Sequence, residues 1–401
     1  MDSADVRSKF AIYDENPELA YLDSASTTLV PRDAVRASAD FMNTTVVSSR
    51  KGAHRLATKG AALVESTRKV LAGYLDTEPS QLSFQKSIPS AVASLAYGYP
   101  WKEEKRNRVA IARSEENSVL VTLLRIAKVL DLTVDIIPTD SEGTLDSAEL
   151  DKAINEKTGI VAVGHVSPGI GNINPIKQVS ELAHEMGAIL LTDAARSMGF
   201  TESSIADLGS DVLIFSGNVG LMGPPGLAVQ WIDASLGAAH EPGILGGAAV
   251  SSVTDSEYEI ALPPDKFESG MLNIPAIVGL NVSLRFLQGL RGFSSHLRNL
   301  SKYMTQRLSA IKELTLYGSP NENRTIFGFN LGSGGDLNCH DIALFLDESQ
   351  VAVRSGLICA HPLVQSIAED GLVQASLHVY NTHEDVDRLC GALELIASDF
   401  L

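Results

Sequence analysis

Seven short apolar runs alternate with helix-like segments between residue 82 and about residue 235, and this alternation constrains the fold more than any other feature. The runs cover residues 82–84, 109–112, 134–137, 160–163, 189–192, 212–215 and 227–231. Six of the seven are preceded or followed by a segment with helical spacing of its apolar residues. The pattern predicts an α/β fold whose mostly parallel sheet is covered by helices on both faces. In such sheets ligands bind at the carboxyl ends of the strands.

A smaller α/β domain is expected to follow at the C-terminus. Its helical and strand-like segments cover residues 275–288, 294–314, 325–331, 340–348, 351–354, 373–379 and 384–398. A chain of 401 residues exceeds one comfortable hydrophobic core, and its 44% apolar composition is ample for two. We therefore expect a large domain over residues 21–270 and a smaller one built from residues 1–20 and 271–401.

Charge and hydropathy narrow the function classes. Forty-nine acidic against thirty-two basic residues give a net charge of −17, which repels nucleic acid and anionic membranes. No run approaches ~18 apolar residues, and the acidic N-terminal segment does not resemble a signal peptide. We therefore expect a cytoplasmic protein that binds neither nucleic acid nor a membrane.

Three cysteines, Cys339, Cys359 and Cys390, are too few and too scattered for a disulfide framework. None belongs to a C-x-x-C pair, so we expect no metal site. At most one of the three thiols is expected to carry chemistry.

A turn rich in glycine and proline follows the apolar run at 212–215. From Ser216 to Gly226 it reads S-G-N-V-G-L-M-G-P-P-G. It resembles the lysine-bearing turn of the class V aminotransferase group, above all of cysteine desulfurases and selenocysteine lyases, where Ser-Gly-His-Lys ends a strand and a Gly-Pro pair follows. Asn218 stands at the histidine and Val219 at the lysine. The resemblance implies pyridoxal phosphate joined to that lysine as a Schiff base, and valine has no nitrogen to form one.

Motifs from Tyr21 to Leu389 carry the same resemblance. Y-L-D-S-A-S at 21–26 is similar to the family's Y-L-D-x-A-A entry motif, and E-E-N-S-V-L at 115–120 is similar to its E-H-N-S-V-L. Further family motifs are matched in order at 84–91, 164–175, 190–197, 268–275, 353–363 and 373–384. The resemblance implies the fold-type-I architecture of pyridoxal-phosphate transferases, with a large domain and a smaller C-terminal one.

The departures from the family fall on positions that the resemblance assigns to cofactor or substrate. The replacing residues are Ile88, Pro89 and Met271 at phosphate ligands, Glu116 at the ring-stacking histidine, Pro168 at an asparagine near the ring, Arg196 at a glutamine, and Gln374 at the carboxylate-binding arginine. Asp193 is retained, which the resemblance implies pairs with the pyridinium nitrogen. Cys359, implied to be the nucleophile that takes sulfur from substrate, is retained as well.

We therefore predict a degenerate family member that takes no pyridoxal phosphate and has lost catalysis that depends on it. Its vestigial pocket would consist of Glu116, Asp193, Arg196, Ser216, Asn218 and Val219. Two carboxylates facing a dry cavity are costly unless a cation joins them. Arg196 is accordingly expected to bridge Asp193, Glu116 or both.

Three functions stay open. The preferred one is a non-catalytic scaffold or regulatory partner in sulfur transfer or iron–sulfur cluster assembly, as a homodimer or a heterodimer with an active paralogue. The second is a persulfide carrier in which Cys359 accepts sulfur from another enzyme, and a buried packing role for that thiol competes with it. The third is an enzyme with changed chemistry, binding a small anion near Arg196 or Lys86.

Overall fold

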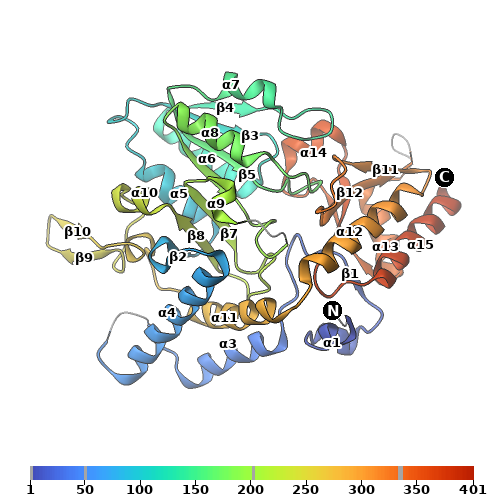
Figure 1. The fold of residues 1–401 in the computed structure, drawn as a ribbon, viewed down its shortest axis with the longest axis horizontal. Coiled ribbons are helices and arrows are strands. Elements are labelled where there is room, and N and C mark those ends of the chain that lie inside the picture. Colours follow the sequence, from blue (N-terminus) through green and yellow to red (C-terminus); the bar gives the residue numbers. More distant parts are fainter. Residues whose placement is uncertain (1–2, 49–51, 201–203, 333–336) are drawn as a thin grey trace.

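The centre of the fold is a seven-stranded sheet (Figure 1). The computed structural model describes residues 3–48, 52–200, 204–332 and 337–401. The strands of this sheet are β2 (Leu82–Gln85), β3 (Arg108–Ala112), β4 (Thr133–Ile137), β5 (Thr158–Gly164), β6 (Ile189–Asp193), β7 (Val212–Ser216) and β8 (Ala228–Ile232). Their order is β2-β8-β7-β6-β5-β3-β4. β8 runs antiparallel to β2 and β7 and the other neighbouring pairs are parallel, which confirms the expected α/β sheet.

Burial explains why these runs form strands. Every residue of β5 and of β8 is buried, so both faces of these strands are covered. Strands covered on both faces read as continuous apolar runs rather than as alternating ones. β4 lies at the edge of the sheet and has exposed residues among its five, as expected for a strand with only one neighbour.

Helices cover the sheet. They are α3 (Arg32–Thr44), α4 (Arg55–Leu75), α5 (Ile88–Gly98), α6 (Asn117–Leu130), α7 (Leu150–Ala153), α8 (Ile176–Glu185), α9 (Ile205–Leu208), α10 (Ala234–Ala239) and α11 (Ile274–Gly289). Figure 1 shows α3, α4 and α11 together at the lower edge, where α11 contacts both of the others. A Cβ on Gly279 of α11 would lie 2.5 Å from Ser38 Oγ and 2.4 Å from Pro224 Cγ. The close approach of α11 to α3 and to the turn after β7 therefore requires glycine.

A second sheet of four strands forms the smaller part of the molecule. Its order is β11 (Leu314–Tyr317), β12 (Ile326–Leu331), β15 (Leu372–Ser376) and β14 (Arg354–Gly356). The helices α12 (Phe293–Ser309), α13 (Cys339–Glu348) and α15 (His383–Phe400) pack on it, and α14 (His361–Ile367) follows β14.

Two boundaries in this smaller part differ from the sequence expectation. The helix expected over 294–314 ends at Ser309, because Leu314–Tyr317 pairs with β12 as β11. The strand expected over 351–354 is split, because β13 (Val351–Ala352) pairs with β1 (Ala20–Tyr21), whereas β14 pairs with β15. In both places pairing between distant segments decides the local structure, as is usual for strands.

The N-terminal segment packs against both parts of the chain. It contains α1 (Ser3–Arg7) and α2 (Ile12–Glu15), and β1 follows. The ring of Phe10 lies 6.0 Å from that of Phe286 in α11 and 5.1 Å from that of Tyr380. Arg7 Nη2 lies 2.5 Å from the buried carboxylate of Asp385 at the start of α15. The expected boundaries between the large and the smaller domain, after residue 20 and after residue 270, stay a prediction.

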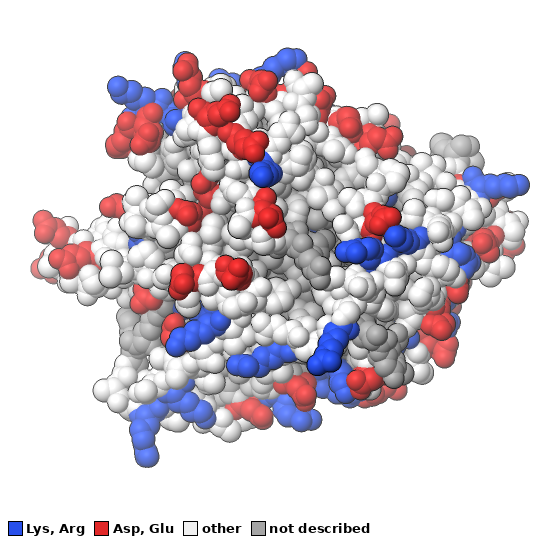
Figure 2. Space-filling model, viewed as in Figure 1, with Lys and Arg blue, Asp and Glu red and all other residues white. Residues whose placement is uncertain are grey.

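The surface charge agrees with the acidic composition. On the face shown in Figure 2, basic side chains are interspersed with acidic ones and form no continuous tract. Phosphate-backbone binding requires such a tract. In the described ranges, the hydrophobic segments within helices are all too short or too polar to cross a membrane.

Candidate functional site

The turn that follows β7, residues 216–226, keeps its shape through its backbone. We refer to it as the lysine-position turn. The Gly217 N–H donates to the carbonyl oxygen of Leu227 at 2.8 Å. A Cβ on Gly220, whose φ is +74°, would lie 1.9 Å from the carbonyl oxygen of Met198. Glycines therefore specify the path of this turn, whichever side chain stands at position 219.

Two residues of the turn occupy the positions where the resemblance places a histidine and a lysine. The Val219 side chain is buried, with 7% exposed, and it offers no amine. The Asn218 carbonyl oxygen accepts from the Thr28 backbone N–H at 2.9 Å, and its amide donates to the Thr27 hydroxyl at 3.2 Å. Ser216 ends β7 in register with Ala228 of β8. Both replaced positions thus serve packing and the docking of the turn on the segment after β1.

Asp193 ends β6 and is buried. Its Oδ1 accepts from the Ala195 backbone N–H at 2.8 Å. Burial raises the pKa of the Asp193 carboxyl to about 6, the positive charge of Arg196 opposes this rise, and the negative charge of Glu116 adds to it. The site therefore holds a buried carboxyl that changes its charge close to neutral pH.

A second buried carboxyl, that of Glu115, lies beside Asp193, and no role was predicted for it from the sequence. Glu115 is 1% exposed, its Oε1 accepts from the Glu116 backbone N–H at 3.0 Å, and its Oε2 has no hydrogen-bond partner among the described residues. Burial and the Asp193 charge raise the pKa of the Glu115 carboxyl well above its usual range. The available signal in the sequence was the pair of adjacent glutamates, Glu115 and Glu116, of which only Glu116 stands at a replaced family position.

Glu116 has a structural role at the start of α6. As the N-cap residue, it accepts from the Ser118 backbone N–H through Oε2 at 3.0 Å. A carboxylate at this place satisfies a free N–H and lies at the positive end of the helix. This contact holds one oxygen of the carboxylate, so it explains how glutamate is tolerated where the family has a ring-stacking histidine.

Arg196 does not form the expected bridge. In the parts of the chain that the structure describes, Arg196 makes no hydrogen bond or ion pair with Asp193 or Glu116, and its buried Nε has no partner. Each carboxylate already accepts a hydrogen bond from a backbone N–H group, Asp193 from Ala195 and Glu116 from Ser118, so neither relies on Arg196 alone. Arg196 still lowers the pKa of Asp193 and of Asp23 through its charge. The expected bridge is therefore wrong, because no direct contact forms. Only the attraction between the Arg196 charge and the Asp193 carboxylate agrees with the expectation.

Three further replaced positions, Gln374, Ile88 and Pro89, also have structural roles. The Gln374 side chain is buried in β15, and its amide donates to the carbonyl oxygens of Pro168 and Gly169, the latter at 3.3 Å. Ser87 caps α5, with Ile88 and Pro89 as the first two residues of the helix. A proline there removes an N–H group from the helix end while preserving the helix. Gln374 thus holds the neighbouring loop through contacts that do not involve a substrate carboxylate.

Cys359 lies in a loop between β14 and α14 and is half-buried, whereas Cys339 and Cys390 are 3% and 0% exposed. Arg354 Nη2 donates to Cys359 Sγ at 2.8 Å. The Cys359 carbonyl oxygen accepts from the Asn117 backbone N–H, the first of α6, at 2.7 Å. The loop therefore lies against the helix that Glu116 caps. Arg354 is a second residue of the site that was not predicted from the sequence, although it stands inside the matched motif at 353–363.

The backbone of this loop is strained. Ile358 and Cys359 have φ values of 51° and 52°, in the left-handed region that branched side chains rarely adopt. Such strain persists only where surrounding contacts enforce it, and it is concentrated at functional sites. The Asn117 contact is one such constraint.

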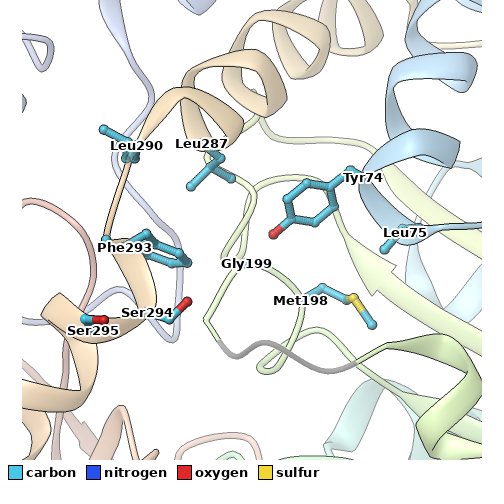
Figure 3. Close-up of a pocket in the computed structure, with 10 residues that line it drawn as sticks. Tyr74, Leu75, Met198, Gly199, Leu287, Leu290, Phe293, Ser294 and Ser295 are labelled. Atoms are coloured by element: carbon cyan, nitrogen blue, oxygen red, sulfur yellow. The ribbon is translucent and has the colours of Figure 1, made fainter.

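A separate cavity of about 320 Å³ lies between α4, α11 and the start of α12 (Figure 3). Figure 3 shows the rings of Tyr74 and Phe293 and the Met198 side chain around it. None of the residues expected in the cofactor pocket lines it. Among the described residues, no group of three or more His, Cys, Asp or Glu side chains is arranged to hold a metal ion.

The comparisons with known proteins agree on one family. The family model for aminotransferase class V matches residues 20–389. A probable cysteine desulfurase of Pyrococcus abyssi is 32% identical over 94% of this chain and 94% of its own length. The apo structure of a cysteine desulfurase from Thermococcus onnurineus NA1 is 31% identical, covers 98% of both chains and superposes with a TM-score of 0.90.

A more distant solved structure bears on the cofactor. It is a lysine-to-alanine mutant of C-DES with glycine covalently linked to the pyridoxal-phosphate cofactor, 17% identical with a TM-score of 0.84 over 98% of this chain and 99% of that one. At this identity the likeness shows the fold alone, and the cofactor is that protein's own. The class V family match and the desulfurase relatives point to pyridoxal phosphate as the cofactor of the family.

The expectation that this chain takes no cofactor is therefore wrong. It relied on the missing lysine together with the replaced phosphate, ring and carboxylate positions, and the lysine provides only the covalent link among the interactions that hold the group. The buried carboxyl of Asp193, which has no cation within ion-pair distance among the described residues, fits a protonated ring nitrogen, whereas Val219 offers no covalent link. Asp193 thus fits the ring of a cofactor held without a bond to position 219, whereas Ile88, Pro89 and Met271 offer no hydroxyl group to its phosphate. By its fold, motifs and relatives, the chain belongs to the class V aminotransferase family and is a member of the cysteine desulfurase group.

Proposed function

We propose that this chain is a sulfur carrier of the cysteine desulfurase family, in which the Cys359 thiol accepts sulfur from a persulfide. The contact of Arg354 with Cys359 Sγ at 2.8 Å, in a half-buried loop, is the observation that carries the proposal. A cation at a thiol favours the thiolate, which is the nucleophile in sulfur exchange. A pure scaffold would not need this contact, so the geometry favours the carrier over the scaffold.

The proposal includes the loss of desulfuration that depends on the protein's own lysine. Val219 offers no amine, and Gln374 donates to the carbonyl oxygens of the 168–169 loop instead of presenting two charged donors to a carboxylate. Pyridoxal phosphate, when bound, supplies an electron sink for amino-acid substrates. Asp193 would hold a proton at the ring nitrogen, because its raised pKa lets the carboxyl share one near neutral pH.

The transfer step balances without an added oxidant. The Cys359 thiolate attacks the outer sulfur of a donor persulfide, R–S–S–H. The new bond to Cys359 Sγ forms as the donor's S–S bond breaks, and the donor leaves as a thiolate that takes up a proton. Arg354 stabilises the negative charge on Sγ before the attack. The acceptor of the carried sulfur would be a sulfur-transfer or iron–sulfur assembly protein.

Peptide mapping tests the proposal. The purified chain is incubated with glutathione persulfide and then treated with a reagent that tags persulfides, and the three cysteine peptides are compared. We expect the tag on Cys359, with the buried Cys339 and Cys390 of the same digest as internal controls. A Cys359→Ser variant should lose the tag. An untagged Cys359 in the folded wild-type chain would contradict the carrier and leave the non-catalytic scaffold.

A dimer, with a second copy or with an active paralogue, is part of the proposal. Its support is the strong exposure of two large apolar side chains that are close in sequence, Leu262 at 82% and Met271 at 73%. A contiguous apolar patch is typical of interfaces, and homodimers are the commonest oligomers. Light scattering at micromolar concentration is expected to give twice the chain mass, and a monomer would count against this part of the proposal.

A further inference from the structure

The entry motif at 21–26 is held beside the strand that carries Arg354. Asp23 forms a parallel bridge with Ser376 at the end of β15. The Ser376 N–H donates to the Leu22 carbonyl oxygen at 2.7 Å, and the Ala25 N–H donates to Ser376 Oγ at 2.8 Å. β15 pairs in turn with β14, the strand of Arg354. These contacts hold the motif close to the Cys359 loop, and its link to the thiol is indirect.

A chain of hydrogen bonds links this motif to the thiol. Ser26 Oγ donates to Asp23 Oδ1 at 2.6 Å, so its single proton is committed and its lone pairs are free to accept. Arg354 Nη1 donates to Ser26 Oγ at 3.4 Å, and Nη2 of the same guanidinium donates to Cys359 Sγ at 2.8 Å. Because the guanidinium is planar and rigid, fixing one nitrogen sets the direction of the other.

We propose that Asp23 and Ser26 are positioning residues that aim the Arg354 guanidinium at Cys359 Sγ and so set the reactivity of that thiol. The inference deepens the proposed carrier function and rests on it for its biological meaning. Its test measures the thiol directly and needs no sulfur donor, so the two can fail separately.

The charges around the thiol define the sign of each expected effect. The titratable and charged groups on the surrounding segments include Arg354 on β14, Asp23 after β1, Arg196 after β6, Glu115 and Glu116 before α6, and His361 at the start of α14. Burial raises the pKa of Asp23, and the Ser26 hydrogen bond and the charges of Arg354 and Arg196 oppose that rise. Asp23 thus has two opposing effects on Cys359. It orients the guanidinium, and its negative charge offsets the guanidinium's positive one.

These two effects separate in two substitutions. Ser26→Ala removes the orienting contact and leaves every charge in place, so the thiolate should become less favourable. Asp23→Asn keeps an oxygen that accepts from Ser26 and removes the negative charge, so the thiolate should become more favourable. A merely structural role for the motif would not shift the thiol in opposite directions.

The measurement is the rate of Cys359 alkylation by iodoacetamide as a function of pH, followed by mass spectrometry of the Cys359 peptide in the full chain. We expect the midpoint to rise by ~0.5 pH unit in Ser26→Ala and to fall by a similar amount in Asp23→Asn. Ser355→Ala is the matched control, because Ser355 lies next to Arg354 on the same strand but bonds His340 Nδ1 at 2.9 Å. Its midpoint should equal that of the wild type.

Thermal unfolding of each variant shows whether the fold is retained. Shifts of the midpoint in the same direction in both variants, or no shift in either, would overturn the positioning role. Opposite shifts together with a Cys359 that takes no sulfur from a persulfide donor would support the positioning role and contradict the carrier function.

Discussion

By the family resemblance, the lysine-position turn and the Cys359 loop belong to one site, and they differ in which family residues this chain has kept. In the turn the glycines that shape the backbone remain, while Val219 and Asn218 serve packing and docking. In the loop both the strained backbone and the polar contact to the thiol remain. The comparison teaches that backbone shape and chemistry are specified by different residues, so one can be lost while the other is kept.

The largest expected effect concerns the turn. If its backbone still has the family shape, Val219→Lys should regain a covalent link to added pyridoxal phosphate, which borohydride reduction makes permanent. We expect a reduced adduct on residue 219 in this variant and none on that residue in the wild type, as measured by peptide mass. Val219→Met is the matched control of similar length without an amine. An adduct missing from a folded Val219→Lys variant would show that the turn has also lost its shape.

The second prediction concerns the loop. Arg354→Gln removes the cation at Cys359 Sγ and keeps a donor of similar reach. Alkylation of Cys359 at neutral pH should slow by ~10-fold, because loss of a close positive charge disfavours the thiolate. Arg354→Lys should recover part of the rate. An unchanged alkylation rate in Arg354→Gln would show that the Arg354 contact does not activate Cys359, so the loop would have kept no more chemistry than the turn.

The third prediction uses the raised pKa of Asp193 beside the turn. A carboxyl whose folded pKa is about 6, above its ordinary value of 3.8, gives stability that is present at low pH and lost as pH rises through 6. Asp193→Asn keeps the acceptor for Ala195 and cannot ionise. Its free energy of unfolding relative to wild type should therefore increase by on the order of 2 kcal/mol between pH 4 and pH 8.

Urea denaturation at the two pH values measures this effect. Asp151→Asn, at an exposed position, is the control and should show no such change. If the free energy of unfolding of Asp193→Asn changes with pH as that of the wild type does, the pKa of Asp193 is not raised in the folded protein.

The smallest expected effect concerns Glu116. Replacing this N-cap residue by alanine leaves the Ser118 N–H without its acceptor and should lower the free energy of unfolding by ~1 kcal/mol. Glu116→Asp, which can still cap the helix, should lose less. An unchanged free energy of unfolding in Glu116→Ala, measured by chemical denaturation, would mean that the Glu116 side chain does not stabilise α6.

The sequence predicted the central sheet well because its strands are buried on both faces and read as continuous apolar runs. β11 was missed because its partner β12 decides its structure, and the residues before it continue a helical pattern. Motif spacing located Asp193 and Cys359, since these retain the residue types of the family. The prediction that the chain takes no cofactor treated the missing lysine and the replaced contact positions as the loss of the whole site.

The contacts within the site could not be read from the sequence. The link from Asp23 through Ser26 to Arg354 depends on how the entry motif lies against β15, which brings together residues more than three hundred positions apart. Gly164 gives the buried Glu115 carboxyl room, since a Cβ there would lie 3.3 Å from Glu115 Oε1, a tight contact. Arg196 was expected to bridge carboxylates because backbone N–H donors are invisible in a sequence.

The most direct test of the central claim compares two sulfur sources on the same wild-type chain. One sample receives glutathione persulfide, the other receives L-cysteine with pyridoxal phosphate, and the intact mass and the Cys359 peptide are measured in both. We predict that the persulfide adds one sulfur atom to Cys359 and that cysteine with pyridoxal phosphate adds none, because the thiol is retained and the lysine is not. Sulfur on Cys359 from cysteine and pyridoxal phosphate alone would contradict this account.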